Sequence, residues 1–457
     1  MMLLSEAAAA LGASVIGRDV RFTSVSTDSR TIEAGALFVA LRGERFDGHD
    51  YLGAARESGA AAALVERVGG HAGQAAGLPL IPVGDARLAL GALAKHWRGR
   101  LAIPVIAIVG SNGKTTVKEM LAAALRAHFG ERQVLATLGN LNNDVGLPLS
   151  ALRLREEHAV AVLEIGMNHP GETGYLAGIA RPTIAVINNA QREHQEFMKS
   201  VEEVAAEHAA VLRALPNDGV AVLNRDDTYY GYWAGVAGKR RVRSFGTGAD
   251  ADVRATYRLG PASSDIEIAA DGARAAATLS MPGVHSVRNA LAASAAALAA
   301  GASLAAVARG LASFRAVKGR LQFRPGRNGV LVIDDTYNAN PDSVRAAVDV
   351  LAASDRPRVL ILGDMGEVGS KGEAFHAELG RYAKDSGVDR LLVVGPLGRA
   401  AARAFGAGGE HFDSVEAVIA RAQGLTALKG TMLVKGSRFM RMERVVDHLV
   451  AGEAACC

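Results

Sequence analysis

The segment Gly110-Ser-Asn-Gly-Lys-Thr-Thr116 constrains the fold of this chain more than any other. It follows an apolar run, Ile103 to Val109, that is typical of a buried strand, and it precedes a helix-like stretch from Val117 to Ala127. Glycines in such a turn let the backbone amides curl around phosphate groups, and the next helix offers its positive end. This order of strand, loop and helix predicts an α/β domain with a mostly parallel sheet.

Two side chains of the loop carry chemistry. Lys114 can reach the outer phosphates of a nucleotide, and the Thr115 hydroxyl can bind Mg²⁺. The loop is shorter than the common phosphate-binding spacing, because Ile108 stands where the first glycine is usual. Strand and helix still flank it on the correct sides, so we predict ATP or GTP binding rather than a chance turn. The predicted nucleotide-binding residues here are Gly110, Ser111, Asn112, Gly113, Lys114, Thr115 and Thr116.

Length and alternation predict three α/β domains. A chain of 457 residues exceeds one ordinary hydrophobic core. We expect a small N-terminal α/β domain over 1–100, a central domain over 101–314, and a C-terminal Rossmann-like domain over 315–457. The last contains four apolar runs separated by helix-length stretches, which are Val330 to Ile333, Arg358 to Leu362, Arg390 to Val394 and Thr431 to Val434.

Composition excludes several classes of protein. Hydrophobic residues make up 49% of the chain and charged residues 21%, which is typical of a globular protein. The net charge of +4 is small, and no basic block interleaved with aromatic residues argues for nucleic acid. A membrane helix needs about 20 apolar residues, and no apolar stretch of the sequence is that long. The sequence also has no recognisable secretory signal. We therefore expect a cytoplasmic protein without stable membrane insertion. Cys456 and Cys457 are expected to be reduced and incidental.

Two further residues are candidates for metal binding. Glu164 ends a predicted strand at the edge where open α/β sheets bind ligands, and a carboxylate there can hold Mg²⁺ between phosphates. A strand-end acid without a metal is the alternative. His194 follows another strand and Asn188-Asn189, and is either a ligand or a solvated loop histidine.

Taken together, the motifs resemble those of the Mur ligases of peptidoglycan synthesis, and the resemblance runs essentially from end to end. Besides the phosphate loop, it rests on 137–143, 163–172, 285–289, 319–321 and 334–340. Four more segments, 26–30, 37–49, 362–367 and 434–438, are similar to the family members that join D-alanyl-D-alanine to UDP-N-acetylmuramoyl-tripeptide. The Asp-Asn-Pro-Arg tetrapeptide of the ligase that adds the third peptide residue is missing from this chain.

The resemblance implies an ATP- and Mg²⁺-dependent ligase with a role for each domain. The N-terminal domain would hold the uridine nucleotide, assisted by asparagines of the central domain. The C-terminal domain would close over ATP, with Asn289 near adenine, Arg320 on phosphate and Asp335 on ribose. The implied substrate-binding residues are Ser29, Arg30, Arg42, Asp47, His49, Asn140, Asn142, Asn143, Lys435 and Arg438. For Lys435 and Arg438, the alternative is that they contact only solvent.

The catalytic set implied by the resemblance is Lys114, Glu164, His194 and Arg320. Many members of the family carry a carbamylated lysine further along the chain from the His194 position, where this chain has Glu207 and His208. We therefore expect Glu207 to supply a metal-binding carboxylate together with Thr115, Glu164 and His194.

The implied reaction activates the peptide carboxylate as an acyl phosphate before the amine attacks. Two alternatives stay open: a related ligase of the same fold, such as the third-residue-adding enzyme or folylpolyglutamate synthase, and a phosphate-loop ATPase that acts as a regulator. The third residue of the tripeptide, diaminopimelate or lysine, is also open. We expect a monomer.

Overall fold

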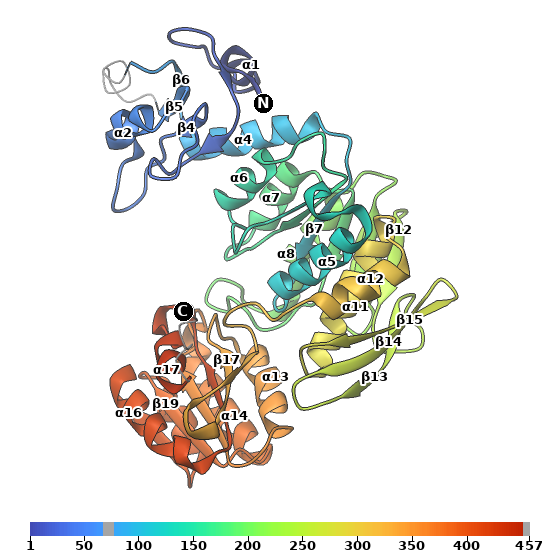
Figure 1. The fold of residues 1–457 in the computed structure, drawn as a ribbon, viewed down its shortest axis with the longest axis vertical. Coiled ribbons are helices and arrows are strands. Elements are labelled where there is room, and N and C mark those ends of the chain that lie inside the picture. Colours follow the sequence, from blue (N-terminus) through green and yellow to red (C-terminus); the bar gives the residue numbers. More distant parts are fainter. Residues whose placement is uncertain (67–76, 451–457) are drawn as a thin grey trace, which may run out of the picture.

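The computed structural model describes residues 1–66 and 77–450 (Figure 1). In the N-terminal domain, four parallel strands lie in the order β3-β4-β5-β6. The strands are β3 (Val25–Ser26), β4 (Leu37–Val39), β5 (Ala62–Glu66) and β6 (Leu80–Val83). The other elements are β1 (Met2–Leu3), α1 (Leu4–Ala10), β2 (Arg21–Phe22), the short helix η1 (Gly48–Tyr51), α2 (Leu52–Glu57) and α4 (Ala86–Gly99).

A six-stranded parallel sheet forms the centre of the molecule, in the order β12-β11-β10-β7-β9-β8. Its strands are β7 (Val105–Val109), β8 (Val134–Ala136), β9 (Val160–Glu164), β10 (Ile184–Ile187), β11 (Val220–Asn224) and β12 (Arg241–Phe245). The helices are α5 (Lys114–Phe129), η2 (Glu131–Gln133), α6 (Gly146–Leu152), α7 (Glu172–Ala180), α8 (Val201–His208), α9 (Ala210–Arg213), α10 (Tyr230–Ala237), α11 (Val284–Ala299) and α12 (Leu304–Ser313). β7, β9 and β10 are buried throughout, as expected for central strands of a parallel sheet with helices on both faces.

The position of β7 explains where the phosphate loop lies. β7 pairs with β9 on one side and β10 on the other, so the chain leaves it at the point where the strand order reverses. In open parallel sheets, ligands bind at the carboxyl ends of the strands beside such a point. The ends of β7, β9 and β10 therefore bring the phosphate loop, Glu164 and Asn188 to one edge.

An antiparallel sheet that we did not predict from sequence packs against α11 and α12. Its strands are β13 (Arg254–Leu259), β14 (Ser264–Ala270) and β15 (Ala273–Leu279). Along β14, Ile266 and Ile268 are buried and Glu267 is exposed between them. This alternation is the signature of a sheet with one wet face.

The C-terminal domain contains a second six-stranded sheet, in the order β16-β17-β21-β18-β19-β20, with only β16 antiparallel. The strands are β16 (Gln322–Pro325), β17 (Leu331–Asp335), β18 (Arg358–Gly363), β19 (Arg390–Val394), β20 (Gly409–Phe412) and β21 (Thr431–Lys435). The helices are η3 (Arg327–Gly329), α13 (Pro341–Ala352), η4 (Gly369–Lys371), α14 (Gly372–Asp385), α15 (Gly398–Phe405), α16 (Val415–Leu425), η5 (Thr426–Leu428), η6 (Arg438–Met440) and α17 (Glu443–Leu449).

The α/β class with three domains is confirmed. In Figure 1 the N-terminal domain (blue) and the C-terminal domain (orange to red) lie at opposite ends of the central domain. The exact boundaries at 100 and 314 stay a prediction, with α12 ending at Ser313. Within the described ranges, no helix is both long and apolar enough to cross a membrane. Cys456 and Cys457 lie outside the described residues.

Candidate active site

A cavity of about 1300 Å³ opens between the central and C-terminal domains. Its lining includes the phosphate loop, the ends of β9 and β10, and loops of the C-terminal domain. The predicted site residues that line it are Ser111, Asn112, Gly113, Lys114, Thr115, Thr116, Asn142, Asn143, Glu164, His194, Asn289, Arg320, Asp335, Lys435 and Arg438. The predicted phosphate-loop residues, metal ligands and C-terminal contacts therefore line the same cavity.

Two glycines and two asparagines shape the phosphate loop. Gly110 and Gly113 have positive φ angles of 143° and 82°, which favour glycine. A side chain at Gly113 would also collide with Asn289, so the predicted adenine contact packs directly on the loop. From the end of β10, Asn189 accepts the Asn112 backbone N–H through Oδ1 at 2.9 Å, and Asn188 Nδ2 donates to the Asn112 carbonyl at 2.8 Å. The two asparagines that follow β10 thus fix the loop backbone at Asn112.

Lys114 begins α5, and its ammonium group folds toward the loop. Nζ donates to the Gly110 carbonyl at 2.5 Å and lies 3.5 Å from Glu193 Oε2. Gly110 itself is not among the residues that line the cavity. The side chain is part-buried but lines the cavity, where an anion can reach it.

Thr115, Glu164 and Asn142 form the group that best suits a divalent cation. The Thr115 hydroxyl donates to both Glu164 carboxylate oxygens, at 3.0 and 2.9 Å, and Asn142 Nδ2 donates to Oε1 at 2.7 Å. Among the residues that the structure describes, no three His, Cys, Asp or Glu side chains form a metal cage. Mg²⁺ rarely uses such cages, because it binds through one or two carboxylates, waters and substrate phosphates. Thr115 and Glu164 fit that pattern.

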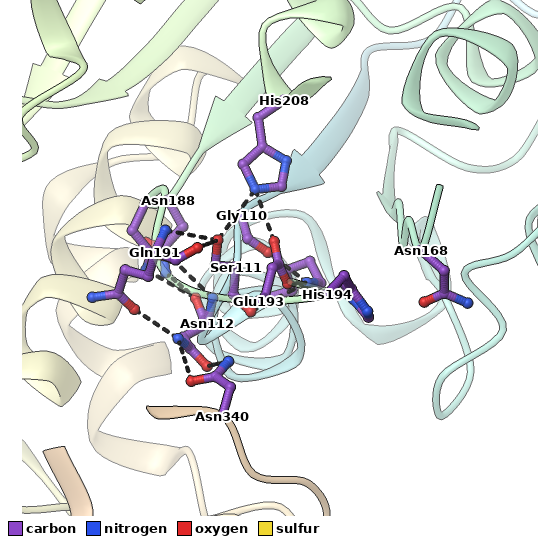
Figure 2. A network of polar contacts seen from close by, with 12 residues as sticks. Gly110, Ser111, Asn112, Asn168, Asn188, Gln191, Glu193, His194, His208 and Asn340 are labelled. Carbon is purple, nitrogen blue, oxygen red and sulfur yellow. Dashed lines mark hydrogen bonds and ion pairs between the residues drawn. The ribbon is translucent and has the colours of Figure 1, made fainter. Parts of the chain in front are cut away.

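Glu193 is a buried carboxylate that sequence reasoning missed. Only 5% of its surface is exposed, and Oε1 lies 3.1 Å from His208 Nε2 (Figure 2). Its other oxygen, Oε2, faces Lys114 and, at 3.7 Å, His194 Nε2. Burial alone would raise the pKa of Glu193, but Lys114, His208 and His194 lower it to about 2. An ionised carboxylate therefore sits behind the phosphate-loop lysine.

The structure does not bring Glu207 to the cavity. Its carboxylate accepts the backbone N–H groups of Gly171 and Thr173, at 2.9 and 2.8 Å, at the start of α7. Glu207 and His208 are neighbours on α8, and consecutive helical residues point in different directions. His208 faces the phosphate loop instead, with Nε2 3.5 Å from Ser111 Oγ.

The predicted residues of the C-terminal domain are tied to one another. Lys435 Nζ lies 2.5 Å from Asp335 Oδ2, and this ammonium group is almost fully buried. The Leu321 backbone N–H donates to the other Asp335 oxygen at 3.1 Å. The guanidinium of Arg320 stacks on Tyr337, 3.9 Å from the ring centre, and its Nε has no hydrogen-bond partner among the described residues. Arg438 pairs with Glu443 at 2.9 Å at the cavity edge.

The predicted residues of the N-terminal domain lie away from the cavity. Arg42 Nε contacts Asp47 Oδ2 at 3.0 Å, Asp47 Oδ1 contacts His49 Nδ1 at 2.5 Å, and Glu66 N–H donates to His49 Nε2 at 3.0 Å. This chain of contacts makes one polar surface. The predicted residues outside the cavity lining, besides Gly110 and Glu207, are Ser29, Arg30, Arg42, Asp47, His49 and Asn140.

Side-chain contacts across the cavity join the central and C-terminal domains. Asn112 and Asn340 exchange side-chain hydrogen bonds at 3.0 and 3.3 Å (Figure 2). His194 Nδ1 lies 2.5 Å from Glu367 Oε2, and this hydrogen bond lowers the pKa of Glu367. His194 and Glu367 both have positive φ angles, 49° and 57°. Strained backbone of this kind is held in place by its surroundings and concentrates at functional sites.

Comparisons with known proteins identify the family. Three protein-family models match successive parts of the chain. Residues 21–98 match the model described as Mur ligase family, catalytic domain, and residues 108–297 match the Mur ligase middle domain. Residues 319–438 match the model described as Mur ligase, glutamate ligase domain. The chain is 41% identical over 450 residues to the UDP-N-acetylmuramoyl-tripeptide–D-alanyl-D-alanine ligase of Escherichia coli (strain K12), with 98% of each chain covered. The chain belongs to the Mur ligase family.

Solved structures agree with this membership of the Mur ligase family. MurF from Acinetobacter baumannii is 34% identical, with a TM-score of 0.88 and 97% of both chains covered. The MurF ligase of Thermotoga maritima, solved in complex with ADP, is 26% identical, with a TM-score of 0.80 and coverage of 94% of this chain and 98% of that one. The predicted three-domain Mur ligase fold is therefore confirmed over nearly the whole chain.

Proposed function

We propose that this Mur ligase joins D-alanyl-D-alanine to UDP-N-acetylmuramoyl-tripeptide, using ATP and Mg²⁺. The observation that carries the proposal is the single cavity that contains both the phosphate loop of the central domain and the Lys435 and Arg438 cations of the C-terminal domain. The named relatives, which cover nearly the whole chain, support the choice of substrates.

The residues suit a reaction in two steps. The tripeptide carboxylate attacks the γ-phosphorus of ATP, ADP leaves, and an acyl phosphate forms. The amine of the dipeptide then attacks the acyl carbon, phosphate leaves, and the amine loses a proton as the amide forms. Lys114 and the loop amides stabilise the charge of the transferring group, and Arg320 adds a second cation. Thr115 and Glu164 would hold Mg²⁺, which would supply further positive charge for the phosphoryl transfer.

We assign the uridine nucleotide to the N-terminal domain, through Ser29 and Arg30 and through the surface of Arg42, Asp47 and His49. Arg87 of α4 supports a path from this surface to the cavity, because it lines the cavity and pairs with Asp144 at 2.9 Å. We also propose a monomer as the active unit.

The proposal is tested by phosphate release from ATP and Mg²⁺, with each substrate omitted in turn. A ligase of the proposed specificity needs both UDP-N-acetylmuramoyl-tripeptide and D-alanyl-D-alanine. Release that ignores both substrates contradicts the proposal and favours a regulatory ATPase. Release that requires a nucleotide dipeptide or a folate instead would point to one of the related ligases. Comparing diaminopimelate- and lysine-containing tripeptides then settles the third residue.

A further inference from the structure

The Glu193 carboxylate is buried, which is energetically unfavourable for a charged group. An ionised carboxylate removed from water is destabilising by several kcal/mol unless charged or hydrogen-bonding partners offset the cost. The partners of Glu193 come from three places: Lys114 at the start of α5, His194 next to it in the chain, and His208 at the end of α8. Figure 2 shows His194 and His208 beside Glu193. All three surround a residue that lines the cavity.

His208 fixes one end of this carboxylate. The ring is 1% exposed, and its Nδ1 has no hydrogen-bond partner among the described residues. The polar contacts of the ring therefore run through Nε2, which lies 3.1 Å from Glu193 Oε1 and 3.5 Å from Ser111 Oγ. Apart from the His208 contact, Glu193 Oε1 accepts no hydrogen bond from the described part of the chain. His208 thus holds the Oε1 end of the Glu193 carboxylate.

The other oxygen of Glu193 faces two groups of the proposed catalytic set. Oε2 lies 3.5 Å from Lys114 Nζ and 3.7 Å from His194 Nε2. Within the described residues, Glu193 is the only carboxylate that pairs with Lys114. His194 in turn contacts Glu367 of the C-terminal domain through its other nitrogen. Glu193 therefore links the phosphate-loop lysine to the residue that touches the closing domain.

We propose that Glu193, oriented by His208, is a positioning residue that holds Lys114 and His194 in the geometry needed for phosphoryl transfer. The proposal rests on the proposed ligase function. Glu193 acts through these two side chains rather than on the substrate. A small displacement of a group that stabilises a transition state reduces turnover by factors of ten to a hundred without preventing binding.

The test compares Glu193→Gln, Glu193→Asp and Glu196→Gln in the full chain. Glu196 is an exposed residue of the same loop and does not line the cavity, so it is the matched control. For Glu193→Gln we expect kcat to fall about tenfold or more, with less than a threefold change in the ATP KM and an unchanged melting temperature. Glu193→Asp should recover part of kcat because it restores the charge. Glu196→Gln should match the wild type.

His208→Gln provides a second measurement. If Glu193 and His208 act as a unit, the double variant should lose no more turnover than Glu193→Gln alone. Additive losses contradict the positioning role of His208.

Three results would overturn the inference: kcat of Glu193→Gln within twofold of the wild type, a loss of kcat that follows a lowered melting temperature, or recovery of full kcat at high Mg²⁺, which would make Glu193 a metal ligand. A wild-type enzyme without substrate-dependent phosphate release contradicts the proposed function instead, so the two failures are distinguishable.

Discussion

Arg192 of the central domain and Asp342 of the C-terminal domain form a two-pronged ion pair, with Nη2 and Oδ1 2.6 Å apart and Nε 3.1 Å from the same oxygen. The Arg192 backbone N–H also donates to Asp342 Oδ2 at 2.8 Å. Glu378 on α14 accepts from the same guanidinium at 2.9 Å. Two carboxylates of the C-terminal domain therefore form ion pairs with one arginine of the central domain, beside the cavity between these domains.

Removing this arginine should open the domains. In Arg192→Ala the backbone hydrogen bond to Asp342 remains, but both ion pairs are lost. We expect about 1 kcal/mol less stabilisation of the closed arrangement, a roughly fivefold shift toward open molecules. Small-angle scattering of the ligand-free protein should show a larger radius of gyration. Arg345→Ala, which loses a contact to Glu378 within one domain, is the control and should leave the radius unchanged.

Lys114→Ala should abolish turnover while the fold is retained. Lys114 is the loop cation that lines the cavity, and loss of one group that stabilises developing charge reduces kcat roughly a hundredfold or more. Steady-state phosphate release measures the effect, and circular dichroism checks the fold. Lys199→Ala removes an exposed lysine and should behave as the wild type. An active Lys114→Ala enzyme would exclude the loop as the phosphate site.

Asp335 should matter for stability as well as for ATP. Asp335→Asn leaves the buried Lys435 ammonium without its carboxylate, which costs about 3 kcal/mol in comparable pairs. Adding Lys435→Met should restore much of the melting temperature by removing the unpaired charge. If Asp335 also binds ribose, both variants keep a raised ATP KM. A normal ATP KM in the double variant, measured with stability restored, argues against the ribose contact.

Glu207→Ala should destabilise α7 and leave Mg²⁺ binding unchanged. The Glu207 carboxylate accepts two backbone N–H groups at the start of α7, and losing such a cap costs about 1 kcal/mol. We expect a lower midpoint of urea unfolding together with an unchanged Mg²⁺ dependence of turnover. A raised Mg²⁺ requirement would restore Glu207 to the list of metal ligands.

The stability of the protein should fall with acid below pH 6.5, in part through His285. Burial lowers the pKa of this residue to about 4, from an ordinary value of 6.5. The folded state therefore binds fewer protons than the unfolded state between these values, so this contribution is present above pH 6.5 and is lost as pH falls toward 4. Urea unfolding at pH 7.5 and 5 should show a smaller difference for His285→Gln than for the wild type. Equal differences would contradict this assignment.

The strands that position the nucleotide site were predictable because they are long apolar runs. Ile103 to Val109 contains β7, within two residues of the observed ends, and Glu164 ends β9 as predicted. The antiparallel sheet of β13, β14 and β15 was not predicted. Its alternating pattern is diluted by alanines, as in β15, and alanine favours helices.

Some cavity residues were predictable from the sequence and others were not. Lys114, Thr115 and Glu164 were predictable because a short motif or a strand end carries them. Glu193 gave no such signal, since a single acid in a loop is ordinary and its partner His208 lies on a helix that follows. Arg192 and Asp342 are 150 residues apart, and only the packing of two domains brings them together.

The reciprocal amide pair of Asn112 and Asn340 has a consequence for ionic strength. Both side chains are uncharged, so dissolved ions do not screen their attraction, whereas the Arg192 pairs weaken as salt concentration rises. Potassium chloride should therefore loosen the edge of the interface at α14 while the asparagine bridge beside the phosphate loop persists. The C-terminal domain would then tilt about that bridge rather than detach.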